Sequence, residues 1–115
     1  MIKILMVCLG NICRSPIAEG IMRDLINSRN LNAMVDSAGT IDFHKGEAPD
    51  LRAIKKAKQH GIDISDLRAR PFVAEDFEIF DKIYVMDKNN YDDITSRTKT
   101  VHKKDKVIMI MNEVL

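Results

Sequence analysis

The chain has 115 residues, of which 45% are apolar, and its 18 lysines and arginines against 17 acids give a formal net charge of +1. This length supports one compact core and is short for two domains of ordinary size, so we expect a single domain over residues 1–115. So small a net charge produces no long-range field, which excludes nucleic acid and membrane as expected partners. Any recognition of an anion must therefore be local.

Cysteine content and hydropathy indicate where the protein works. Cys8 and Cys13 are the only cysteines, which is not the disulfide framework of a small secreted protein. The apolar start runs directly into polar residues without a small-residue cleavage site, and no stretch approaches the length that spans a membrane. We therefore expect a cytoplasmic protein.

Short apolar runs alternate with segments of helical spacing along the chain. Runs rich in β-branched residues predict strands at 2–7, 33–36, 82–86 and 106–111. Helical spacing and end signals predict helices at 16–29, 74–80 and 89–96, and a further helix that carries Leu51, Ile54, Ala57 and Lys58. Ser15 is expected to cap the first helix, with proline following at the first helical position, and Asp50 is expected to cap the second. Gly61 is expected to end the second helix in a left-handed conformation.

This alternation predicts a flavodoxin-like α/β fold, an open parallel sheet of four strands with flanking helices and right-handed crossovers. In such sheets ligands bind beyond the carboxyl ends of the strands. Cys8 and Asp87 follow two predicted strands, and Ser37 opens a predicted loop at residues 37–40 after another. We expect these three side chains to lie at the same edge of the sheet.

The segment Cys8-Leu9-Gly10-Asn11-Ile12-Cys13-Arg14-Ser15 joins the first strand to the first helix. A loop that enters a helix N-terminus turns several backbone N–H groups toward one point, where the helix dipole also favours an anion. Gly10 and Asn11 are residue types that readily take the left-handed angles such a curl requires. The planar fork of Arg14 can bind two phosphate oxygens. The loop is therefore predicted to bind phosphate.

Cys8 at the base of that loop is predicted to act as a nucleophile. The amides, the helix dipole and Arg14 all favour its thiolate form. Ser15 could donate its hydroxyl to the thiolate, or could serve only as the helix cap, and the two roles are compatible. A lone cysteine on an apolar strand is more often an inert small hydrophobe, but the spacing to Arg14 and Ser15 outweighs that interpretation. A zinc site and a nucleotide P-loop lack their ligands, so we expect no metal and no cofactor.

Four segments together resemble the low-molecular-weight protein tyrosine phosphatases, in order along the whole chain: VCLGNICRSP, DSAGT, HGID and Tyr84-Val85-Met86-Asp87. The resemblance implies a hydrolase that removes phosphate from a phosphotyrosine protein or a small aryl phosphate through a phosphocysteine intermediate. Phosphate is then the product.

The resemblance also implies residue roles. The catalytic residues would be Cys8, Arg14 and Ser15. Phosphate would be bound by Leu9, Gly10, Asn11, Ile12, Cys13 and Arg14. The loop would be supported by Asn11, Ser37, His60 and Asp87, although a histidine at a helix end and an aspartate at a helix start also have ordinary explanations. The slot for the aromatic ring would be formed by Leu9, Ile12 and Phe43, and Cys13 would form a reversible disulfide with the nucleophile.

The family's general acid, an aspartate in an Asp-Pro loop, and its last helix follow the fourth strand, whereas this sequence ends at Leu115. We therefore expect either part of a longer protein or a short form with weak turnover, because general acid catalysis is worth about 100- to 10,000-fold. Two other functions remain open. A thiol-dependent arsenate reductase uses the same loop, and a non-catalytic module that binds phosphate or phosphotyrosine would need only the loop.

Overall fold

The computed structural model describes residues 1–110 and confirms the predicted α/β fold. In chain order the elements are β1 (Ile2–Cys8), α1 (Arg14–Ser28), β2 (Ala33–Gly39), α2 (Leu51–Gln59), α3 (Asp76–Ile79), β3 (Lys82–Val85), α4 (Lys88–Ser96), α5 (Val101–Lys104) and β4 (Val107–Met109). All four predicted strands and all four predicted helices are present. The short helix α5 was not predicted.

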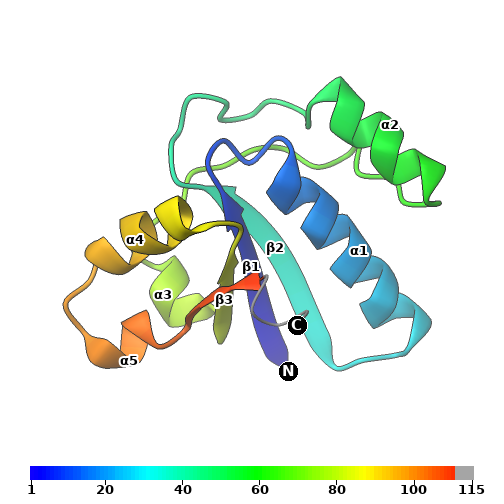
Figure 1. Ribbon diagram of the computed structural model, residues 1–115. Coiled ribbons are helices and arrows are strands. Elements are labelled where there is room, and N and C mark those ends of the chain that lie inside the picture. The colour runs from blue at the N-terminus through cyan, green and yellow to red at the C-terminus, as the bar shows by residue number, and fades with distance from the viewer. Residues whose placement is uncertain (111–115) are drawn as a thin grey trace.

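The four strands form one parallel sheet in the order β2-β1-β3-β4 (Figure 1). The chain moves from β1 to one side of the sheet for β2 and to the other side for β3, so the strand order reverses at β1. Open α/β sheets bind their ligands at such a reversal, beyond the carboxyl ends of the strands. Cys8 is the last residue of β1 and therefore occupies that position.

Helices cover the two faces of the sheet. In Figure 1 α1 and α2 lie on one side, whereas α3, α4 and α5 lie on the other. The larger apolar cluster lies under α3 and α4, where side chains of the strands meet Phe72, Phe77, Phe80 and Ile94. A smaller cluster joins α2 to the segment after it through Ala53, Ala57 and Ile64. Burial of these side chains, at roughly 25 cal/mol per Å² of apolar area, favours this layered arrangement.

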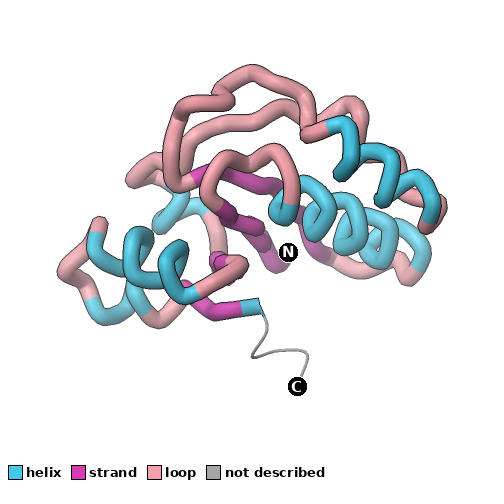
Figure 2. Tube along the Cα trace, turned by 45° about the horizontal axis from the view of Figure 1, so that its top comes forward, coloured by secondary structure: helices cyan, strands magenta, loops and turns pink. Residues whose placement is uncertain are grey.

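Three connecting segments stack at the carboxyl end of the sheet (Figure 2). The segment after β2 pairs with the segment before α3, because Gly46 N–H donates to the Ala69 carbonyl at 2.8 Å and Ala69 N–H donates to the Glu47 carbonyl at 2.9 Å. Gly39 makes a further parallel bridge to Pro71. These contacts place residues that are distant in sequence against the loop that follows β1.

Several predicted boundaries differ from the structure. Helix α1 begins at Arg14, so Ser15 lies inside its first turn and the expected cap at Ser15 is wrong. Strand β2 continues to Gly39, so residues 37–39, predicted as a loop, form the last rungs of the ladder with β1. The expected end of the fourth strand at residue 111 lies outside the described residues. Within residues 1–110, no helix has both the length and the hydropathy needed to cross a bilayer.

Candidate active site

The loop between β1 and α1 is tied to the end of β2 by backbone hydrogen bonds. The Cys8 carbonyl accepts from Thr40 N–H at 2.9 Å, and the Leu9 carbonyl accepts from Ile41 N–H at 3.1 Å. The Cys8 side chain is buried, with 3% of the residue exposed. The sheet therefore holds the sulfur at the base of the loop.

The backbone donors of the loop have no acceptor among the described residues. Within residues 1–110, the N–H groups of residues 10–15 donate to no acceptor. Asn11 takes the expected left-handed conformation, with φ of 58°. Gly10 does not, and the reason for glycine there is space, because a Cβ atom would lie 2.9 Å from Cδ2 of His44. A loop of unpaired donors at the start of α1 has the geometry of an anion site.

A chain of side-chain hydrogen bonds runs from the sulfur into the protein. Cys8 Sγ lies 3.0 Å from Ser15 Oγ. The Asn11 amide donates to Ser15 Oγ at 2.7 Å and to Ser37 Oγ at 2.9 Å. Asn11, Ser15 and Ser37 are thus brought together as the sequence predicted, although Ser37 reaches the loop from inside β2 rather than from a loop of its own.

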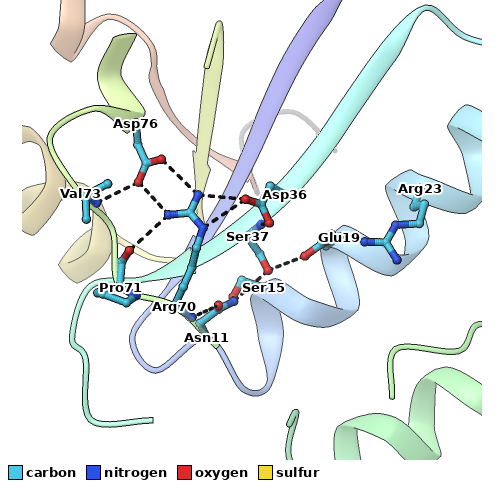
Figure 3. Close-up of polar contacts among 10 residues, drawn as sticks. All are labelled: Asn11, Ser15, Glu19, Arg23, Asp36, Ser37, Arg70, Pro71, Val73 and Asp76. Atoms are coloured by element: carbon cyan, nitrogen blue, oxygen red, sulfur yellow. Dashed lines mark hydrogen bonds and ion pairs between the residues drawn. The ribbon is translucent and has the colours of Figure 1, made fainter. Parts of the chain in front are cut away.

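Arg70 and Glu19, which the sequence analysis missed, make the outer hydrogen bonds of this series (Figure 3). The backbone N–H of Arg70 donates to Asn11 Oδ1 at 3.0 Å, and the Glu19 carboxylate accepts from Ser37 Oγ at 2.6 Å. Glu19 lies one helical turn after Ser15, and this spacing on a partly apolar helix was an available signal. No local pattern indicates Arg70, because its contact spans 59 residues.

Arg14 is held at the rim by Asp87. Its guanidinium donates to Asp87 Oδ2 at 3.0 Å, and Asp87 Oδ1 caps α4 by accepting from Asn90 N–H at 2.8 Å. The hydrogen bond from Asn90 lowers the pKa of Asp87, and the neighbouring Arg14 lowers it further. Asp87 therefore stays ionised and orients the arginine. The predicted meeting of Cys8, Ser37 and Asp87 at one edge of the sheet is observed through these contacts.

A cleft of about 280 Å³ opens above the loop. It is lined by Cys8, Leu9, Gly10, Ile12, Cys13, Arg14, Ile41 and His44. Phe43, expected in the slot, is not among these lining residues. It is 79% exposed and packs edge to face against His44, with 4.8 Å between the ring centroids. His44 and Ile41 were missed, since isolated loop residues carry no periodic signal.

Two further predicted residues behave differently from each other. Cys13 is an exposed residue that lines the cleft, and the partial burial of its thiol together with the nearby Asp50 carboxylate raises the pKa of that thiol, so it remains protonated at neutral pH. His60 ends α2 and is exposed, and in the part of the chain that the structure describes its side chain makes no hydrogen bond to the loop. The described residues thus show His60 only at the end of α2, and its support of the loop stays a prediction.

The fold and the loop now have counterparts among known proteins. The family model for low molecular weight phosphotyrosine protein phosphatase matches residues 3–114. The phosphatase of that name from Homo sapiens is 45% identical over 101 residues, which cover 86% of this chain and 63% of the human protein. A protein tyrosine phosphatase structure from Entamoeba histolytica superposes with a TM-score of 0.92 at 39% identity, covering 97% of this chain and 72% of that one.

A third protein with the same fold is named for a different substrate. The structure of a Drosophila arginine phosphatase superposes with a TM-score of 0.90 at 34% identity, covering 98% of this chain and 73% of that one. The family match extends over almost all of the chain, from residue 3 to residue 114. The chain belongs to the low molecular weight phosphotyrosine protein phosphatase family.

Proposed function

We propose that this chain is a protein tyrosine phosphatase in which the loop of residues 8–15 binds the phosphoryl group and Cys8 is the nucleophile. The observation that carries the proposal is the 3.0 Å contact between Cys8 Sγ and Ser15 Oγ at the base of the cleft bordered by Arg14. A hydroxyl that donates to sulfur favours the thiolate, which is the nucleophilic form.

The proposed reaction has two displacements at phosphorus. In the first, Cys8 Sγ bonds to phosphorus while the bond from phosphorus to the tyrosine oxygen breaks, and the leaving phenolate takes up a proton from solvent. In the second, a water oxygen attacks phosphorus and loses a proton to solvent, and phosphate is released while the S–P electron pair returns to sulfur as thiolate. The loop amides and Arg14 stabilise the phosphoryl charge in both steps, and Ser15 stabilises the sulfur as leaving group.

The lining of the cleft supports an aryl phosphate as the substrate class. Leu9, Ile12 and Ile41 present apolar side chains beside the phosphate loop. Such a lining stabilises a buried aromatic ring, whereas the cationic guanidinium of phosphoarginine would lose hydration against these apolar side chains. We therefore propose phosphotyrosine in a protein, or a small aryl phosphate, over phosphoarginine.

The proposed location is the cytoplasm. Cys8 and Cys13 are both free thiols in the structure, and a reaction that depends on the Cys8 thiolate requires a compartment that keeps thiols reduced.

The test compares the wild-type protein with Cys8→Ser and Arg14→Lys on p-nitrophenyl phosphate and on a phosphotyrosine peptide. We expect Cys8→Ser to lose turnover but still bind phosphate, and Arg14→Lys to lose both binding and rate, because lysine lacks the bidentate fork. Rapid quenching of the wild-type reaction should reveal phosphate on Cys8. Full turnover by Cys8→Ser would contradict the mechanism.

The same experiment separates the other functions. Phosphate binding without phosphocysteine, even on p-nitrophenyl phosphate, would favour a non-catalytic binding module. Reduction of arsenate by a thiol donor, lost in Cys13→Ser, would favour an arsenate reductase. Faster hydrolysis of a phosphoarginine peptide than of a phosphotyrosine peptide would overturn the proposed substrate.

A further inference from the structure

Glu19 is a buried carboxylate behind the phosphate loop, and none of the predicted roles uses it. Only 3% of the residue is exposed. Oε1 accepts from the Ser37 hydroxyl at 2.6 Å, and Oε2 accepts from the Arg23 guanidinium one turn later in α1. Figure 3 shows the carboxylate between these two partners. A charged side chain is rarely buried without a partner or a function, so its two contacts need an explanation.

The Glu19 carboxylate determines which atoms donate and which accept in the hydrogen bonds that lead to Asn11. A serine hydroxyl has a single proton, and an ionised carboxylate can only accept. The Ser37 proton is therefore committed to Glu19, and Ser37 Oγ offers only lone pairs to its other neighbour. That neighbour is the Asn11 amide nitrogen, a donor, at 2.9 Å. The carboxylate thus fixes Ser37 as the acceptor for Asn11.

The orientation of the Asn11 amide is fixed from its other end by Arg70. The backbone N–H of Arg70 donates to Asn11 Oδ1 at 3.0 Å, so the oxygen faces Arg70 and both amide hydrogens face the serines. A flipped amide would place its oxygen against Ser37 and Ser15. It would accept the Ser15 proton and turn that proton away from the sulfur.

The same assignment of donors and acceptors continues from Asn11 through Ser15 to Cys8. Ser15 Oγ accepts from Asn11 at 2.7 Å, which leaves its own proton free for Cys8 Sγ at 3.0 Å. We propose that Glu19 is a positioning residue that, through Ser37 and Asn11, directs the Ser15 hydroxyl proton onto Cys8. This inference rests on the proposed function of Cys8 as the nucleophile. It adds a residue one helical turn away from the loop to the machinery of the same site.

The energetics of Glu19 agree with a functional origin. Burial raises the pKa of Glu19, and the nearby Asp36 adds to the rise, while the Ser37 hydrogen bond and Arg23 oppose it. A carboxyl group with a raised folded-state pKa stabilises the fold at low pH, and this contribution is lost as pH rises through the folded pKa. Ionising Glu19 therefore costs stability relative to its protonated form, and the hydrogen bond from Ser37 and the nearby Arg23 do not fully offset this cost.

The test replaces Glu19 by methionine, which fills similar space but cannot accept the Ser37 proton. The first readout is the rate at which iodoacetamide alkylates Cys8 between pH 4.5 and 9, followed by peptide mass spectrometry so that Cys13 is scored separately. Glu19→Met removes the hydrogen bond from the Ser37 hydroxyl to a charged carboxylate. We therefore expect the variant to slow alkylation of Cys8 at pH 6 by about 3- to 10-fold. The rate at pH 9 should stay close to wild type.

The kinetic readout is p-nitrophenyl phosphate hydrolysis by the same variants. We expect kcat to fall about 3- to 10-fold in Glu19→Met with KM changed less than about twofold, because Arg14 and the loop amides still bind phosphate. Glu19→Gln keeps one oxygen for Ser37 and should rescue most of both effects. Asp24→Asn removes an exposed charge from the same helix and should match wild type.

The outcomes separate this inference from the proposed function. An unchanged alkylation profile in Glu19→Met, with hydrolysis intact in the wild type, would overturn the inference and leave the phosphatase standing. A slowed alkylation in Glu19→Met with no hydrolysis in the wild type would support the inference and overturn the phosphatase. If Glu19→Met fails to fold, the second variant is Ser37→Ala, which removes the hydroxyl between Glu19 and Asn11. This variant must then slow the alkylation of Cys8 in the same way. A wild-type alkylation profile in Ser37→Ala would overturn the inference.

Discussion

Replacing Arg70 by methionine tests how strongly the ion-pair cluster behind the loop stabilises the fold. All five N–H groups of the guanidinium donate, to Asp36 Oδ2, to both oxygens of Asp76 and to the Pro71 carbonyl, at 3.0–3.2 Å. Methionine keeps an unbranched stem and the backbone N–H that holds Asn11, but it removes every side-chain donor. The substitution therefore isolates the charge cluster from the loop contact.

The cost follows from how buried each partner is. The Asp76 side chain is only 3% exposed, whereas those of Asp36 and Arg70 are 42% and 31% exposed. Breaking a fully buried pair costs about 3–5 kcal/mol, and an exposed pair is worth about 0–1 kcal/mol. Asp76 keeps one hydrogen bond, from Val73 N–H at 2.9 Å. With solvent screening of the half-exposed partners, we expect a loss of about 2–3 kcal/mol in the free energy of unfolding.

Urea unfolding at pH 7 measures this loss, and Arg68→Met is the matched control. Arg68 lies two residues earlier, is exposed, and donates only to the backbone carbonyls of Ser65 and Leu67. Its replacement should change the free energy of unfolding by less than about 0.5 kcal/mol. If the two variants unfold at the same urea concentration, the cluster around Arg70 does not stabilise the fold and the reasoning from burial fails.

Two further substitutions test other parts of the structure. Gly20→Ala should gain about 1 kcal/mol in helix propensity but lose about 1–3 kcal/mol by overpacking. The loss should dominate in urea unfolding, because the new Cβ would lie 2.6 Å from Cγ2 of Ile64, which is fully buried, and a more stable variant would contradict this. Asp87→Asn keeps a capping side chain but loses the charge. Because the folded state lowers the pKa of Asp87, its charge stabilises the fold above the unfolded pKa of about 3.9, and this contribution is lost as pH falls through the lower folded value. The two proteins should thus differ in stability at pH 7 and begin to converge as pH falls below about 4, and a constant difference would exclude the charge as the cause.

The elements of the fold could be predicted because their signals are local. Residues 2–7 form an apolar run, and the helix at 51–59 has both its aspartate cap and its terminal glycine, with φ of 77° at Gly61. Alternation of such segments is enough to predict a parallel sheet, and a parallel sheet is enough to place Cys8 at the binding edge. The loop motif was likewise visible, since Cys8, Arg14 and Ser15 are close in sequence.

Local signals failed where tertiary contacts determined the structure. Ser37, Ala38 and Gly39 are weak strand formers, yet they extend β2 because β1 supplies hydrogen-bond partners as far as Cys8. Ser15 has the side chain of a helix cap, but its hydroxyl is engaged by Cys8 and Asn11 instead. The role of Gly10 depends on His44, a residue on another segment that no pattern places above the loop.

The loop of residues 8–15 is therefore a local motif whose precise shape depends on distant residues. Asn11 holds its left-handed conformation between Ser37, which is 26 positions away, and the Arg70 backbone, which is 59 positions away. The side chain of Arg70 is in turn fixed by carboxylates on β2 and α3. Because the segment before α3 must be in place before Asn11 can be oriented, the order of donors onto Cys8 forms only when the sheet and its connecting segments have assembled. A peptide of the loop alone would retain the residues of the motif and lack that order.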